Sequence, residues 1–271
     1  MRIVTSIKDP GFSALSKMAK QGTNNADSIV LDNMPLLESA VNAGVEILGV
    51  MWDERYVDKD YAISITNLLE SRGVDVMCGT HHLIRRLEIS QAQPQVVFAI
   101  KAKEMVIDSN TDLRSLGSRF LVMLDVMDPM NVGTIMRHAE AFGYRVILAG
   151  EAVSGISRHV FRSSTGSAIR KPIYRFRGDG AMLADFISAQ DFQMITTSAH
   201  ADSPISRFEF KKNHVIFVGN ESRGLPIELR KACKDDVYIP MMPGGVHSIN
   251  VAAASSISMY SGMLACGEGN L

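Results

Sequence analysis

One stretch of the sequence, residues 120–143, limits the possible folds more than any other. Phe120 to Val126 is an apolar run of strand length, and an Asp-Pro pair ends it because proline has no N–H and disfavours helical geometry in the residue before it. We expect Asn131 to cap a helix whose apolar residues recur at helical spacing until Gly143. A strand, a turn and a helix in this order predict one unit of an α/β protein.

The same alternation of apolar runs and helical periods continues along the chain. It predicts a small α/β sandwich domain over residues 1–102, a polar linker over residues 103–118 and a second α/β domain over residues 119–271. Strands of the second domain are expected at Phe120–Val126, Arg145–Leu148, Ile173–Arg175, Gln193–Thr197, Val215–Val218 and Val237–Ile239, and a long helix at about Ile249–Ala265. A chain of 271 residues is long enough for two such cores.

Charge is unevenly distributed, although the net charge of −1 gives no global indication of a nucleic-acid partner. From Ala152 to Gly178 there is no acidic residue, whereas six basic ones occur there: Arg158, Arg162, Arg170, Lys171, Arg175 and Arg177. A local basic patch of this kind is compatible with a polyanionic ligand, and equally with a solvated basic face. If the ligand is RNA, this stretch is the expected RNA path.

Several functional classes are disfavoured by composition. The three cysteines are odd in number and far apart, so they match neither a disulfide framework nor a metal site, and we expect no bound metal. The N-terminus lacks the apolar core of a signal peptide, and no apolar run approaches the length of a membrane span. We therefore expect a soluble, cytoplasmic protein that does not bind membranes.

Two later strand ends also carry polar residues. Glu221 adds a carboxylate to a glycine-rich turn after the strand Val215–Val218. Ser248 and Asn250 follow a Pro/Gly loop, where they are placed to cap a helix. Each stretch alone is explained as an ordinary strand–turn–helix corner. Together with Arg137, they predict polar groups at the carboxyl ends of strands, where open α/β sheets bind ligands.

These stretches contain three motifs in a fixed order: Asn-x-Gly-x-x-x-Arg at 131–137, Gly-x-Glu-x-x-Gly at 219–224, and Ile-Pro-Met followed by Ser-x-Asn-Val at 239–251. In this the chain resembles the SpoU/TrmH-like RNA ribose 2′-O-methyltransferases of the SPOUT class. The resemblance implies an α/β catalytic domain with a trefoil knot, S-adenosyl-L-methionine as cofactor and a homodimer. It also implies RNA as partner, with ribosomal RNA favoured over transfer RNA, and an N-terminal domain that holds this substrate.

The resemblance also assigns roles to ten residues. The catalytic candidates are Arg137, Asn131, Glu221, Ser248 and Asn250, the cofactor-binding candidates are Thr197, Gly219, Ile239 and Ile249, and the candidate for substrate RNA is Arg162. A guanidinium keeps its proton, since its pKa lies above about 12. We therefore expect Arg137 to hold an RNA phosphate and to stabilise the developing alkoxide, while the group that removes the 2′-hydroxyl proton is left unassigned.

The sequence departs from the family pattern in two places and leaves alternatives open. The third loop is one residue longer than the pattern, and Asp32-Asn33 stands where many relatives carry Glu-Gly. A non-catalytic RNA-binding homologue is one alternative, although all motif positions are filled. A nucleotide-dependent Rossmann enzyme is another, but there is no Gly-x-Gly-x-x-Gly after a strand and no P-loop. An antibiotic-resistance role is also open, because the Ile-Pro-Met-Met start of the third motif is shared with resistance methyltransferases.

Overall fold

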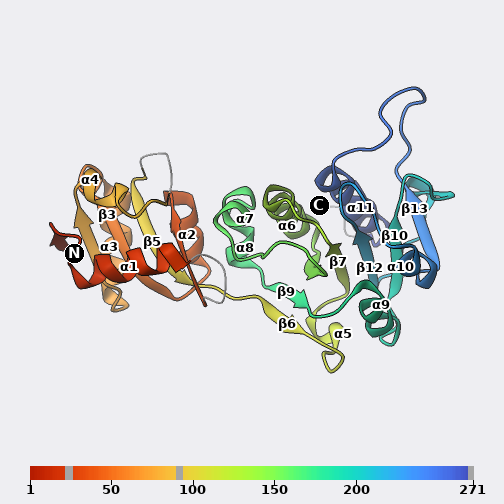
Figure 1. The fold of residues 1–271 in the computed structure, drawn as a ribbon, viewed down its shortest axis with the longest axis horizontal. Helices are drawn as coiled ribbons and strands as arrows, with labels where there is room; N and C mark the ends of the chain where they lie inside the picture. The colour runs from red at the N-terminus through yellow and green to blue at the C-terminus, as the bar shows by residue number, and fades with distance from the viewer. Residues whose placement is uncertain (22–26, 90–93, 268–271) are drawn as a thin grey trace. The chain divides into compact units, whose positions relative to one another are not determined.

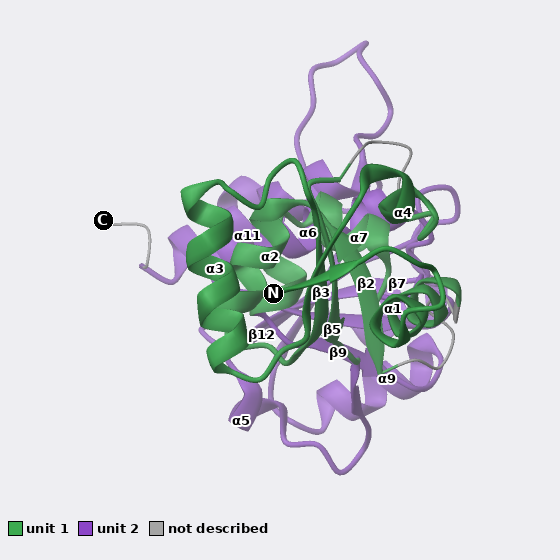
Figure 2. Cartoon of the chain, turned by 90° about the vertical axis from the view of Figure 1, so that its left-hand side faces the viewer, with its two compact units in different colours: residues 1–103, 156–170 green, residues 104–155, 171–271 purple. Residues whose placement is uncertain are grey.

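The computed structural model describes residues 1–21, 27–89 and 94–267 (Figure 1). The chain forms two compact units, shown in different colours in Figure 2. Unit 1 contains residues 1–103 and 156–170, and unit 2 contains residues 104–155 and 171–271. The chain therefore passes from one unit to the other three times, and residues 156–170 pack with unit 1 although the sequence on both sides of them belongs to unit 2.

Unit 1 is built on a five-stranded sheet with the order β1-β4-β3-β5-β2. Its strands are β1 (Arg2–Val4), β2 (Ser28–Asp32), β3 (Ile47–Asp53), β4 (Val76–Gly79) and β5 (Val96–Lys101). Its helices are α1 (Pro10–Gln21), α2 (Met34–Asn42), α3 (Asp60–Ser71), α4 (His81–Arg85), α7 (Arg158–Ser163) and α8 (Ser167–Arg170). Strand β5 runs antiparallel to β2 and β3, and the other pairs are parallel. Figure 2 shows α1 and α4 on one side of this sheet and α2 and α3 on the other.

Unit 2 is built on an eight-stranded sheet with the order β11-β13-β10-β12-β7-β8-β9-β6, in which every pair is parallel. Its strands are β6 (Met105–Ile107), β7 (Arg119–Leu124), β8 (Arg145–Ala149), β9 (Ile173–Phe176), β10 (Gln193–Thr197), β11 (Ser203–Pro204), β12 (His214–Val218) and β13 (Asp235–Tyr238). Its helices are α5 (Leu113–Leu116), α6 (Pro129–Phe142), α9 (Gly180–Ser188), the 3-10 turn η1 (Ile205–Arg207), α10 (Ile227–Ala232) and α11 (Val251–Ala265). The strands expected in the second domain are all present, with ends displaced by at most two residues.

Of the stretch 103–118, expected as a linker, residues 104–118 belong to unit 2. Strand β6 pairs in parallel with β9 and forms one edge of the sheet. Helix α5 begins at an Asp112 cap and buries Leu113 in the core of unit 2. The polar composition of this stretch conceals its structure, because an edge strand and a single helical turn bury few side chains.

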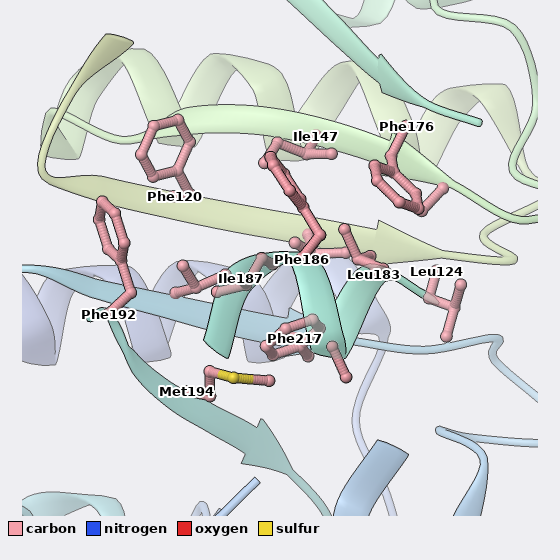
Figure 3. Close-up of a cluster of buried hydrophobic side chains, with 14 of the residues drawn as sticks. Phe120, Leu124, Ile147, Phe176, Leu183, Phe186, Ile187, Phe192, Met194 and Phe217 are labelled. Carbon is pink, nitrogen blue, oxygen red and sulfur yellow. The ribbon is translucent and has the colours of Figure 1, made fainter. Parts of the chain in front are cut away.

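The core of unit 2 lies between the sheet and helices α5, α9 and α10 (Figure 3). Phe186 and Ile187 of α9 point towards the strands, where they meet residues such as Phe120 and Phe217. Burial of each such side chain stabilises the fold by roughly 1.5–3 kcal/mol. Helices α6 and α11 pack on the opposite face of the sheet. Both faces are therefore covered, which is the usual arrangement for a fully parallel sheet.

The strand order decides which loops meet. Strand β12 pairs with β7, although 89 residues separate Leu124 from His214 by number, so the loops that follow these two strands leave the same edge of the sheet as neighbours. Strand β10 joins β12 to β13, which brings the chain after β13 to this edge as well. Of the helices in the described ranges, none is both long enough and apolar enough to cross a membrane.

Candidate functional site

Helix α6 begins earlier than the sequence suggested, and this changes the position of Asn131. Asp128 is the N-cap, since its Oδ1 accepts a hydrogen bond from the Met130 amide at 2.9 Å, and Pro129 is the first helical residue. The predicted cap at Asn131 is therefore wrong. Proline suits the first helical position, which leaves the preceding Asp as the cap. The Asn131 side chain is consequently free to reach other loops.

Asn131 links the three motif stretches by two hydrogen bonds. Its Nδ2 donates to Glu221 Oε1 at 2.8 Å, and its Oδ1 accepts from Asn250 Nδ2 at 3.0 Å. Asn250 in turn caps α11, because its Oδ1 accepts from the Ala252 amide at 2.8 Å. The expected proximity of the polar groups of these loops is thus confirmed for Asn131, Glu221 and Asn250.

Asn220 holds the glycine-rich turn in shape, and sequence reasoning overlooked it. Its Oδ1 accepts from the amides of Ser222 and Arg223 at 3.0 and 3.1 Å, and its Nδ2 donates to the Asp125 carbonyl at 3.0 Å. These bonds fasten the loop after β12 to the end of β7 and so position Glu221. An Asn next to a glycine just past the end of a buried strand is a common turn residue, and this was the available signal.

Gly219 is required by the backbone of its own turn. A Cβ at this position would lie 2.5 Å from the carbonyl carbon and oxygen of Gly224, which is closer than any real Cβ contact. Gly224 adopts a left-handed conformation with φ +67° and donates its amide to the Asn220 carbonyl at 2.8 Å. The tight turn explains both glycines, and the role of Gly219 towards the cofactor stays a prediction.

Arg137 is exposed on α6, and its guanidinium makes no hydrogen bond or ion pair with the residues that the structure describes. The next residue, His138, turns towards α11, where its Nδ1 is hydrogen bonded to the Ser256 hydroxyl. Partial burial lowers the pKa of His138, and the positive charge of Arg137 lowers it further. Among the described residues Arg137 therefore offers an unpaired cation, on the same helix as Asn131 and six residues further along it.

A cavity of about 120 Å³ lies where β10, β13 and the start of α11 meet. Its lining includes Thr197, Ile239 and Ile249, which were predicted to hold the cofactor, and also Ser248, which was predicted to be catalytic. Gly219 does not line it. Complete small-molecule sites measure roughly 300–1,000 Å³, so this cavity can accommodate one part of a larger ligand. Its apolar walls and neighbouring hydroxyls suit a heteroaromatic ring such as adenine.

Arg162, the candidate for RNA binding, is engaged within unit 1. Its Nη2 lies 2.6 Å from both carboxylate oxygens of Asp32, and that carboxylate is almost completely buried. In the same segment, Arg158 donates to the carbonyls of Val30 and Ala19. The ion pair accounts for Asp32 at the position where the sequence departs from the family pattern.

The acid-free stretch has further protein partners. Arg170 donates to the Ser39 hydroxyl in unit 1, and Arg175 forms a bidentate pair with Glu104 in unit 2. Four of the six basic residues therefore serve protein contacts, which leaves Lys171 and Arg177 exposed. A role of Arg162 in RNA binding stays a prediction, and it would require exchange of Asp32 for phosphate.

Solved structures place this architecture in a known class of proteins. An S-adenosylmethionine-bound rRNA methyltransferase from Sinorhizobium meliloti matches with a TM-score of 0.79 and 22% identity, covering 96% of each chain. The SpoU methyltransferase AviRb from Streptomyces viridochromogenes matches with a TM-score of 0.77 and 23% identity, covering 94% of this chain and all of that one. The fold is that of the SPOUT-class methyltransferases, whose catalytic domain carries the trefoil knot.

Sequence relatives define the family more closely. Residues 118–260 match the SpoU rRNA Methylase family, and the chain belongs to it. An uncharacterized tRNA/rRNA methyltransferase of Synechocystis is 27% identical over 266 residues, which cover 95% of this chain and 92% of the relative. The 23S rRNA (uridine(2479)-2′-O)-methyltransferase of Streptomyces viridochromogenes is 32% identical over 181 residues, 64% of this chain and 61% of that enzyme. The chain is thus an RNA methyltransferase that uses S-adenosyl-L-methionine.

Proposed function

We propose that this enzyme methylates a ribose 2′-hydroxyl of RNA, with ribosomal RNA favoured over transfer RNA as substrate. The observation that carries the proposal is the hydrogen-bonded cluster of Asn131, Glu221 and Asn250, together with Arg137 on the helix of Asn131, whose guanidinium has no partner among the described residues. The ribose specificity is supported by the Streptomyces viridochromogenes relative, whose name specifies a 2′-O position in 23S rRNA.

The cation and the cluster meet two requirements of the reaction. S-adenosyl-L-methionine supplies an electrophilic methyl group, and the protein must align a ribose hydroxyl with it. Arg137 suits an RNA phosphate and an oxygen that gains negative charge, because a guanidinium stays protonated and donates in a planar fork. Its lack of a partner within the described residues leaves these donors available.

The cluster suits the orientation of the hydroxyl. Asn131 occupies only Oε1 of Glu221, and Oε2 makes no hydrogen bond to the described residues. That oxygen is therefore available to accept a hydrogen bond from the 2′-hydroxyl. Ser248 and Asn250 would complete the wall between this cluster and the cavity lined by Thr197. The adenosyl group would occupy the cavity, held by Thr197, Ile239 and Ile249.

The direct experiment measures transfer of labelled methyl to ribosomal RNA and transfer RNA transcripts, followed by mapping of ribose methylation. Arg137→Ala should lose at least a hundredfold in kcat/KM, because both phosphate binding and alkoxide stabilisation are removed. Arg207→Ala, at another exposed arginine of unit 2, is the matched control. Full activity of Arg137→Ala would refute its role. RNA binding without any binding of S-adenosyl-L-methionine in calorimetry would instead indicate a non-catalytic homologue.

We also propose that the enzyme is a homodimer in the cytoplasm. Residues 239–250 lie outside any helix or strand and expose large apolar side chains, above all Met242 with 83% and Val246 with 68% of the residue accessible. Apolar side chains exposed to this degree favour burial against a second protein surface. Light scattering after size exclusion should give twice the mass of one chain, and Met242→Asp with Val246→Asp should shift it to one. Cell fractionation tests the location.

A further inference from the structure

Unit 1 contains a groove that has no part in the site described above. It lies between α1 and the end of α4, on the side of the five-stranded sheet where Figure 2 shows these two helices. Its volume is about 710 Å³, which is within the range of roughly 300–1,000 Å³ that ligand sites occupy. The groove is therefore large enough to take a ligand of its own.

The rim of the groove carries three cations. Lys17 and Lys20 stand three residues apart on α1, so they share one face of that helix, and Arg86 faces them from the end of α4. None of the three side chains makes a hydrogen bond or an ion pair with the residues of the described ranges. Like charges that share a groove without forming ion pairs repel one another, and a bound polyanion would relieve this repulsion.

The groove also has an apolar part and one acidic group. Ile7 lies in the groove with 56% of its surface accessible, and Phe12 forms part of the floor. Glu88 lines the groove as well, and it holds a left-handed backbone conformation with φ +53°, which is uncommon for a residue of this type. With three cations and one carboxylate, the lining carries a net charge of about +2 on a chain whose net charge is −1.

From this combination we infer that the groove binds a single-stranded segment of the substrate RNA. The inference rests on the proposed function, since it takes RNA as the substrate. Lys17, Lys20 and Arg86 contact successive phosphates, while Ile7 contacts the face of an unstacked base or a ribose. A duplex would hide its bases from Ile7, so a single strand satisfies more of the groove. Glu88 can accept a hydrogen bond from a ribose 2′-hydroxyl or a base amino group.

The test measures the affinity of the full-length protein for a fluorescein-labelled 20-nucleotide single-stranded RNA of mixed sequence, by anisotropy at several salt concentrations. The variant is Lys17→Glu with Arg86→Glu, one change from each wall of the groove. Loss of two phosphate contacts should make the slope of log K against log salt shallower by about 1.4, since each contact on a single strand contributes about 0.7. At 0.1 M salt we expect binding at least tenfold weaker.

The matched control reverses two charges on the opposite side of the same sheet. Lys59→Glu with Arg72→Glu changes exposed residues at the two ends of α3 and alters the net charge equally. It should change neither the slope nor the affinity. Lys17→Gln with Arg86→Gln is the milder version if the reversed charges reduce folding, and circular dichroism and thermal melting verify the fold of each variant.

Three outcomes would overturn the inference: no binding of this RNA by the wild type, equal weakening by the control pair, or competition by polyglutamate as effective as by unlabelled RNA. The proposed function fails separately. If the wild type binds RNA through the groove but transfers no methyl group to any RNA, the groove stands and the enzymatic proposal falls. If methyl transfer proceeds and the groove variant binds RNA like the wild type, the groove falls alone.

Discussion

The buried pair of Tyr144 and His214 should make the stability of unit 2 depend on pH. His214 begins β12 and is completely buried, and its Nε2 accepts from the Tyr144 hydroxyl at 2.5 Å. Its Nδ1 donates to the Lys211 carbonyl at 2.7 Å. Both ring nitrogens therefore have partners only when the ring is neutral, with the proton on Nδ1. Protonation at Nε2 would place a second donor against the tyrosine hydroxyl.

The size of the effect follows from the two pKa values of this histidine. The pKa of His214 is lowered from 6.5 to about 4: burial is the largest cause, the hydrogen bond to the Lys211 carbonyl opposes it, and the positive charge of Arg119 adds to the lowering. The values differ by about 2.5, and at 1.36 kcal/mol for each pKa unit this amounts to about 3 kcal/mol. Because the folded-state pKa is depressed, the unfolded chain binds the proton first. The stabilisation is therefore complete above pH 6.5 and is lost as the pH falls towards 4.

Urea unfolding at pH 7.5, 6.5, 5.5 and 4.5 measures this loss. The variant His214→Gln removes the titrating group but retains an acceptor for Tyr144 and a donor for Lys211, so its stability should vary much less over this range. His200→Gln, at an exposed histidine, is the control and should behave like the wild type. Carboxylates contribute chiefly below about pH 5, which separates their effect from that of His214. Equal pH dependence in the wild type and His214→Gln would refute the reasoning.

Three further predictions concern the motif loops and the Arg162 segment. Asn131→Asp places a carboxylate against that of Glu221 and should reduce methyl transfer at least tenfold more than Asn131→Ala does. Because the cluster is largely exposed, the free energy of unfolding should change by only about 1 kcal/mol. Equal activity of the two variants would contradict the role of the bond between Asn131 and Glu221. Gly219→Ala should lower stability by roughly 1–3 kcal/mol in thermal melting, because the added Cβ would clash with the backbone of the turn. The Cβ of Gly224→Ala would meet no atom within 4 Å, so this variant should lose about 1–2 kcal/mol through its positive φ alone. A smaller loss for Gly219→Ala than for Gly224→Ala would be inconsistent with the close approach at Gly219. Arg162→Ala should destabilise the protein by roughly 2 kcal/mol in urea unfolding, since it leaves the buried Asp32 carboxylate without its partner. The double variant that also carries Asp32→Ala should recover part of this loss. An unchanged unfolding curve for Arg162→Ala would show that the ion pair contributes nothing to stability.

Local patterns in the sequence predicted the secondary structure well. The strand Gln193–Thr197 is found at its expected bounds, and the helix expected at about Ile249–Ala265 begins two residues later and ends as expected. Apolar periodicity and the positions of proline and glycine act over a few residues, so a single stretch contains enough information. The order of the three motifs also indicated the family, which residues 118–260 confirm.

The choice of cap on α6 shows where local information became insufficient. Asp128 and Asn131 are both good caps, and three residues separate them. Only the position of the first helical residue, Pro129, distinguishes them. Since Asp128 satisfies the helix end, Asn131 is available to bind Glu221 and Asn250, which lie 90 and 119 residues away in the sequence.

The sequence by itself therefore determined the strands, the helices and the motifs that carry the candidate chemistry. Only the tertiary structure decided which of these side chains form ion pairs or hydrogen bonds within the protein. Arg162 and Arg175 belong to the same acid-free stretch, yet one pairs with Asp32 in unit 1 and the other with Glu104 in unit 2. The Arg137 guanidinium makes no hydrogen bond or ion pair within the part of the chain that the structure describes. The physical reason is that an ion pair depends on the distance between groups in space, which contacts remote in the sequence set. Strand β6 pairs with β9 and brings Glu104 to Arg175, while α7 packs against β2 and brings Arg162 to Asp32.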